Sequence, residues 1–236
     1  MHIKTYVTAA MVLFFASCTQ KEEKGFTISG EIAGLETGHA KLVDEEQNTL
    51  DSVAIENGRF ILKGNLKQPK FVYMFASHDN GDNCIFSKIL LENKDIIMKG
   101  NAQDRKCEYS GATLNDEYMD YVKYLLEIPY QKKVQKLYND LAEASANGKQ
   151  QLKSEIEKEL SAMRDSVISE LMRYRPDAAR SQAAAALVYD QTSIHGIEEK
   201  AFAVSKFDAD FTESYYLNKL REEIAKGVKT DINKQR

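Results

Sequence analysis

The sequence has no tryptophan, only three prolines, three cysteines and four histidines among its 236 residues. It contains neither a His-Glu-x-x-His zinc motif nor a Cys-x-x-Cys pair for thiol-disulfide exchange. A phosphate-binding glycine loop, a Gly-x-Ser-x-Gly nucleophile turn and a Ser-x-x-Lys pair are also missing from it. We therefore predict no catalytic residue, no bound metal and no cofactor, and expect that the protein is not an enzyme.

An excess of positive charge is absent as well. There are 32 lysines and arginines against 36 aspartates and glutamates, which gives a net charge of −4 at pH 7. This balance argues against a nucleic-acid partner. Apolar residues make up 43% of the chain and charged residues 29%, as in a folded globular protein rather than a disordered one. The length allows one large domain or two small ones.

The longest apolar run, from Tyr6 to Ala16, is shorter than the roughly 20 residues that a membrane-crossing helix needs. Because it follows a basic start and ends in small residues, we predict that residues 1–17 are a secretory signal peptide. The sequence Ala16-Ser17-Cys18 resembles the lipobox of bacterial lipoproteins, whose cysteine is acylated. The resemblance implies that Cys18 carries lipid, such as palmitate, and anchors the protein to a bilayer. An ordinary signal peptide with a chance cysteine is the alternative.

A short charged segment follows the cysteine, and residues 18–25 are expected to be a lipidated tether. It resembles the export signal that sends lipoproteins of the Bacteroidetes to the outer face of their outer membrane. The matching residues are Gln20, Lys21, Glu22 and Glu23. The resemblance implies an outer-membrane location, with the cell surface slightly favoured over the periplasmic face. A solvated tether without a signal remains the alternative.

The two other cysteines, Cys84 and Cys107, would then lie in a compartment that permits disulfides. A bridge between them would stabilise the fold by about 3 kcal/mol on the loop-entropy estimate. Two separate buried thiols, packing as small apolar side chains, are the alternative.

Residues 26–112 consist of short alternating runs punctuated by glycine and asparagine, which predicts an antiparallel β domain with the apolar content of a sandwich. Asn57-Gly58 supplies the positive backbone angles of a tight hairpin turn. The polar loop 78–83 offers oxygen ligands but lacks the spacing of a calcium loop, so we predict a turn there.

From residue 113 to residue 236 the apolar period becomes helical, so the predicted fold class is α+β: a β-sandwich followed by an all-helical domain. Asp177 is expected to cap a helix that runs through the alanines 183–186, and Gly227 to end the last helix. The second and third helices are predicted to form a charged hairpin. The expected helices begin near Thr113, Gln131, Leu152, Asp177, Glu198 and Glu213.

Several tyrosines cluster in the first two of these helices, which favours a half-buried amphipathic face. A carbohydrate platform or an aromatic interface is the alternative. The tyrosines are Tyr118, Tyr121, Tyr124, Tyr130 and Tyr138.

The order of Phe-x-Ile-x-Gly at 26–30, Asn57-Gly58-x-Phe60, Leu91-Glu92-Asn93 and Ser110-Gly111 resembles a known domain. It is the N-terminal domain of unknown function in Bacteroidetes lipoproteins of the thiol:disulfide interchange type. The stretch ESYYLNKLREEIAKG is similar to the segment before their thioredoxin-like domain, which this sequence does not contain. Because the matched positions are glycines, turn residues and core residues, the resemblance implies a fold and transfers no catalytic residue.

Together these features predict a non-catalytic envelope lipoprotein that binds a partner protein, a glycan or a peptide. One alternative is an accessory to thiol-disulfide exchange that acts beside a separate thioredoxin-like protein. Another is a hydrolase whose site is not recognisable in the sequence.

Overall fold

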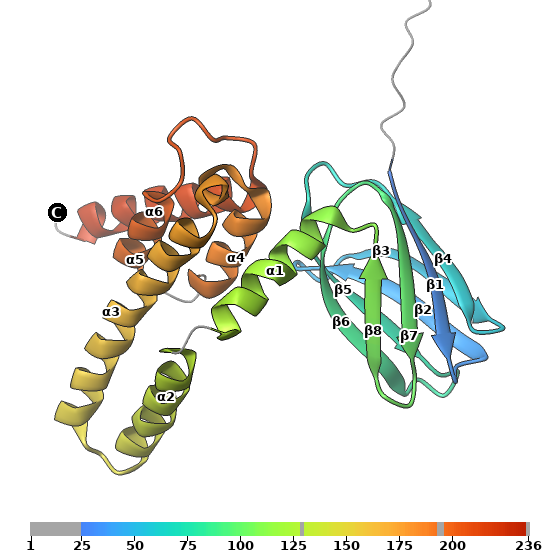
Figure 1. Ribbon diagram of the computed structural model, residues 1–236, viewed down its shortest axis with the longest axis horizontal. Helices are drawn as coiled ribbons and strands as arrows, with labels where there is room; N and C mark the ends of the chain where they lie inside the picture. Colours follow the sequence, from blue (N-terminus) through green and yellow to red (C-terminus); the bar gives the residue numbers. More distant parts are fainter. Residues whose placement is uncertain (1–24, 128–129, 193–195, 235–236) are drawn as a thin grey trace, which may run out of the picture.

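A computed structural model describes residues 25–127, 130–192 and 196–234 of the chain (Figure 1). The predicted signal peptide, Cys18 and the export signal at 20–23 lie outside these residues. Strands occupy the first part and helices the second, which confirms the α+β class. None of the helices in these ranges combines the length and the apolar character that a membrane span requires.

Eight strands form one sheet in the order β6-β5-β2-β3-β4-β1-β7-β8. The strands are β1 (Phe26–Ala33), β2 (Thr37–Asp44), β3 (Thr49–Glu56), β4 (Arg59–Gly64), β5 (Lys70–Ser77), β6 (Asn83–Leu91), β7 (Asp95–Asn101) and β8 (Lys106–Ser110). β1 runs antiparallel to β4 but parallel to β7. The sheet is therefore mixed, whereas the sequence predicted an antiparallel sandwich. A parallel pair needs a long connection, and the five strands between β1 and β7 provide it.

The sheet curls until its two edge strands approach each other, so that it is nearly a barrel. Ser87 of β6 and Tyr109 of β8 join these edges through their hydroxyl groups, which lie 2.5 Å apart. Alternate residues of the strands, such as Ile28, Leu62 and Met98, fill the interior and are fully buried. One curled sheet thus encloses the core that we had assigned to two packed sheets.

Both turn predictions are confirmed. Asn57 and Gly58 have φ values of 52° and 74°, and they connect β3 to β4 at the pair Glu56–Arg59. In the loop 78–83, the backbone N–H of Gly81 donates to the carbonyl of His78 at 2.9 Å. The polar side chains of that loop therefore surround a hydrogen-bonded turn.

The described helical segments are α1 (Thr113–Glu127), α2 (Tyr130–Ala146), α3 (Gln150–Tyr174), the short 3-10 helix η1 (Pro176–Arg180), α4 (Gln182–Thr192), α5 (Ile197–Val204) and α6 (Tyr215–Lys234). The predicted cap of the fourth helix is wrong. Asp177 lies in η1, where its carboxylate pairs with Arg175 at 2.9 Å. Ser181 is extended and ends η1, and its hydroxyl accepts the N–H of Ala184 in the first turn of α4.

The predicted end of the last helix is also wrong, because α6 continues through Gly227 to Lys234. A Cβ atom on Gly227 would lie 2.1 Å from Cδ1 of Ile197 on α5. The glycine therefore permits close packing of two helices and does not end one.

The predicted hairpin of α2 and α3 is present, and it projects from the rest of the helical region (Figure 1). Its own core is small and has three buried residues, Leu137, Ala144 and Ile156. Two large side chains of the hairpin, one on the apolar face of each helix, are nevertheless largely exposed: Tyr138 by 50% and Leu152 by 42%. An isolated pair of helices has too little partner surface to cover every apolar side chain of both stripes.

The tyrosines of α1 are buried or partly buried in the helical core, as the sequence favoured. Tyr121 is fully buried, and Tyr118 and Tyr124 pack against the same helical core. The ring of Tyr124 stacks on that of Tyr174, with centroids 3.7 Å apart. These rings therefore stabilise the helical region and do not form an open platform.

The strands and the helices meet at the outer face of β5 and β6, where Phe71 and Leu90 belong to the helical core. The hydroxyl of Tyr216 accepts the backbone N–H of Phe71 at 2.6 Å and donates to the Glu45 carboxylate at 2.7 Å. Burial raises the pKa of Tyr216 far above its usual range, and Glu45 adds to the rise. This hydroxyl therefore stays protonated and holds α6 against the sheet.

Candidate functional site

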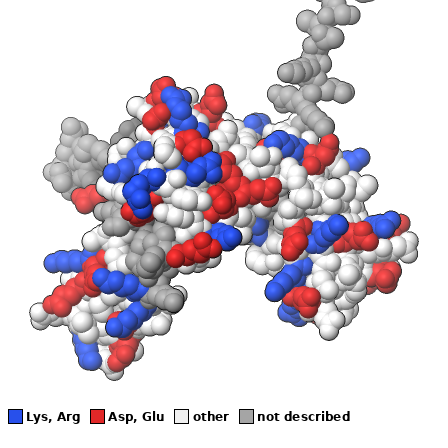
Figure 2. Space-filling view, viewed as in Figure 1, with Lys and Arg blue, Asp and Glu red and all other residues white. Residues whose placement is uncertain are grey.

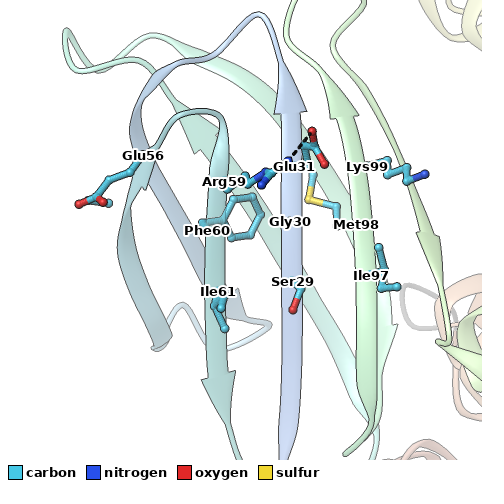
Figure 3. Close-up of a pocket in the computed structure, with 11 residues that line it drawn as sticks. Ser29, Gly30, Glu31, Glu56, Arg59, Phe60, Ile61, Ile97, Met98 and Lys99 are labelled. Atoms are coloured by element: carbon cyan, nitrogen blue, oxygen red, sulfur yellow. Dashed lines mark ion pairs between the residues drawn. The ribbon is translucent and has the colours of Figure 1, made fainter.

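An open groove of about 640 Å³ lies on the outside of the sheet, over β1, β3, β4 and β7 (Figure 3). Its centre is one row of paired residues across three strands. Ser29 of β1 lies opposite Ile61 of β4 and beside Ile97 of β7. Both isoleucines are 54% exposed, and together they form an apolar patch on the surface of the sheet.

The floor of the groove exists because one strand residue has no side chain. A Cβ atom on Gly30 would lie 2.0 Å from Cζ of Phe60, so the phenyl ring occupies the space beneath the glycine. Phe60 itself is buried. In the Phe-x-Ile-x-Gly pattern of β1, Phe26 and Ile28 thus fill the interior, whereas Gly30 has no side chain and leaves room for the ring of Phe60.

The row next to the isoleucines is charged. Glu31 lies opposite Arg59 and beside Lys99, and its carboxylate is 3.6 Å from the Arg59 guanidinium. Glu56 of β3 lies at the far side of the groove (Figure 3). The groove therefore places an apolar centre beside a rim with charges of both signs. Over the face drawn in Figure 2, basic and acidic side chains are likewise interspersed.

The groove offers Ser29 as a hydroxyl side chain. Among the described residues that line it, Ser29 has no histidine or cysteine beside it that could take its proton. Across the described ranges there is also no group of three histidine, cysteine, aspartate or glutamate side chains that could hold a metal ion.

The two cysteines of the β domain are both free thiols in the structure, and no bridge joins them. Cys84 is buried, and its Sγ donates to the Ala76 carbonyl at 3.3 Å. Cys107 is half-buried against the same interior cluster. Burial raises the pKa of Cys84, which disfavours the reactive thiolate form.

Sequence reasoning did not find the groove, although a signal was present. In FIL at 60–62 and IIM at 96–98 the apolar residues are consecutive, so they interrupt the alternation expected of a one-sided strand. Since neighbouring side chains point to opposite faces, a triplet whose first and third residues continue the buried alternation has its middle residue on the outer face. Those middle residues are Ile61 and Ile97.

The molecule thus consists of a curled eight-stranded β domain with a helical region, and its β domain matches a known family model. Residues 26–118 form a domain of unknown function, DUF4369. The matched segment covers all eight strands and the first part of α1. No curated protein and no solved structure matches the chain.

Proposed function

We propose that this protein is a non-catalytic lipoprotein, anchored to the outer membrane through acylated Cys18, that binds a partner protein in the groove on its β domain. The observation that carries the proposal is the pair of half-exposed isoleucines, Ile61 and Ile97, on either side of Ser29. An apolar centre with a charged rim is the usual composition of a protein-binding surface. The export segment at 20–23 supports display on the cell surface.

A photo-crosslinking residue placed at Ile97 tests the groove. We expect a discrete adduct with one envelope protein, and we expect Ile61→Glu to abolish it, because a charge would be buried in the apolar centre. The matched control carries the crosslinker at Leu126 of α1, an aliphatic residue that is 67% exposed. Equal adducts from both positions, or none from Ile97, would sink the proposal.

The anchor is tested separately. In cells fed a palmitate analogue, label should attach to the wild-type protein and not to Cys18→Ala, and the variant should leave the outer-membrane fraction. An unlabelled wild-type protein would contradict the anchor without affecting the groove.

A role beside a separate thioredoxin-like protein is a second candidate. It is favoured by the resemblance to lipoproteins that carry such a domain, and by the two free thiols in one domain. Alkylation of the native protein tests it, since an exchange partner must expose a reactive thiol. Resistance of both Cys84 and Cys107 would remove this candidate.

A further inference from the structure

A second surface, separate from the groove, lies on the outer face of β5 and β6. Phe75 of β5 and Phe86 of β6 are directly opposite each other, with ring centroids 5.1 Å apart. The ring of Tyr73 is nearly parallel to that of Phe86, at 7° and 5.9 Å. Phe86 is 59% exposed, so the three rings form an aromatic platform that is open to solvent.

A polar hollow of about 310 Å³ adjoins this platform and extends over β2 and β3. Phe75 forms one of its walls, and a single hollow therefore joins the rings to hydrogen-bonding groups. The hydrogen-bonding side chains of its lining belong to His39, Lys41, Gln47, Ser52 and Ser77.

The charge of the hollow is of one sign. Its lining contains no aspartate or glutamate, and Lys41 has no ion-pair partner among the described residues. Lys41 lies opposite Phe75 on one side and Ser52 on the other, so this residue stands at the boundary between the rings and the polar lining. A ligand that contacts both the aromatic rings and the polar hollow would bind more tightly if it carried a negative charge near Lys41.

We propose that this surface binds an acidic saccharide of the uronic-acid class. One face of a pyranose ring presents only C–H groups, which pack on aromatic rings, while its hydroxyl groups require donors and acceptors around them. The platform supplies the first contact, the polar hollow the second, and Lys41 pairs with the ring carboxylate. A lipid surface suits the site less well, because it would leave the polar side chains of the hollow without hydrogen bonds.

The test is calorimetric titration of the purified mature chain with short oligomers of galacturonate, glucuronate and mannuronate, and with neutral oligomers of the same length. We expect binding of at least one acidic oligomer at millimolar concentration or below. Phe86→Ala should weaken it about tenfold through loss of ring stacking. Lys41→Gln should remove the preference for the acidic over the neutral oligomer and flatten the salt dependence.

Leu126→Ala, at an aliphatic residue of α1 that belongs to neither surface, is the matched control and should bind the oligomer as the wild type does. Circular dichroism would check that each variant is folded, and Phe86 and Lys41 are both on the surface. The proposal is overturned if no acidic oligomer binds, or if Phe86→Ala and Lys41→Gln bind as tightly as wild type. Binding to neutral phosphatidylcholine vesicles that depends on Phe86, without oligomer binding, would assign the surface to lipid. The groove proposal is unaffected by any of these results.

Discussion

The β domain and the helical region build their cores from different side chains. The interior of the curled sheet is filled by large residues from strands far apart in the sequence, such as Ile28, Leu62 and Met98. In the helical region, α4 buries six consecutive residues from Ala183 to Val188, four of which are alanine. A helix that is enclosed on all sides needs small side chains so that its neighbours can approach. The β domain therefore buries its core by pairing strands that are distant in the sequence, and the helical region does so with small side chains that let the helices pack closely.

The largest effect is expected at the residue that links the two cores. Phe71 is on strand β5 but packs against Tyr118 and Tyr216 of the helical core, with centroids 5.1 Å from each. Phe71→Ala should lower the free energy of unfolding by about 3–5 kcal/mol. Because the regions share this contact, calorimetry should show one thermal transition in the wild type and two in the variant. Phe86→Ala, which removes an exposed ring, is the control, and an unchanged transition in Phe71→Ala would contradict the shared core.

A smaller effect is expected from adding volume to α4. Ala185→Leu should lower the free energy of unfolding by about 1–3 kcal/mol, because Ala185 is fully buried and a larger side chain must displace its neighbours. Denaturant unfolding measures it. Ala142→Leu, on an exposed face of α2, should change stability by less than about 0.5 kcal/mol. Equal effects at both alanines would refute the account of α4.

The smallest effect concerns a buried charge at the end of β2. Asp44 accepts hydrogen bonds from Lys70 Nζ and the Asn48 backbone N–H, each at 2.8 Å. Burial alone would raise the pKa of Asp44, but these hydrogen bonds outweigh it and lower the pKa from 3.8 to about 2. The carboxylate therefore contributes stability above about pH 4, and this contribution is lost as the pH falls towards 2.

Asp44→Asn should cost about 1–2 kcal/mol at neutral pH, and its stability should be less dependent on pH between 4 and 2. Chemical unfolding at a series of pH values measures both. Asp208→Asn, which breaks an exposed pair with Arg180 in the helical region, should change stability by less than about 1 kcal/mol. A variant of Asp44 with the same pH profile as the wild type would disprove the assignment.

Features fixed by neighbouring residues could be predicted from the sequence. The turn at Asn57-Gly58 depends on the backbone angles of two residues, and the helices follow from periods of three and four. The parallel pairing of β1 with β7 could not be predicted, since no local pattern specifies which distant strand lies beside another. Gly227 was misread because a glycine in a helix looks the same in sequence whether it ends the helix or admits a neighbour.

The candidate surfaces likewise combine features that neighbouring residues specify with features that depend on the pairing of distant strands. Ile61 and Ile97 could be placed on the outer face from their triplets, but only the register brings them to either side of Ser29. Phe75 and Phe86 belong to strands whose apolar runs resemble core segments, and only the curl of the sheet assigns their rings to the outside. The sequence-level expectations for Cys18 and residues 20–23 lie outside the described ranges and stay predictions.

The position of β1 between β4 and β7 has a mechanical consequence. Were the chain held at Cys18, as we propose, any pull on the protein would enter the fold at Phe26, the first residue of β1. That strand is hydrogen-bonded along both sides, so a pull along its axis loads the bonds of both ladders in shear at once. A strand at the sheet edge could instead be peeled away one bond at a time when pulled across its axis. A tether at Cys18 would thus be attached to the sheet through a strand that is paired on both sides.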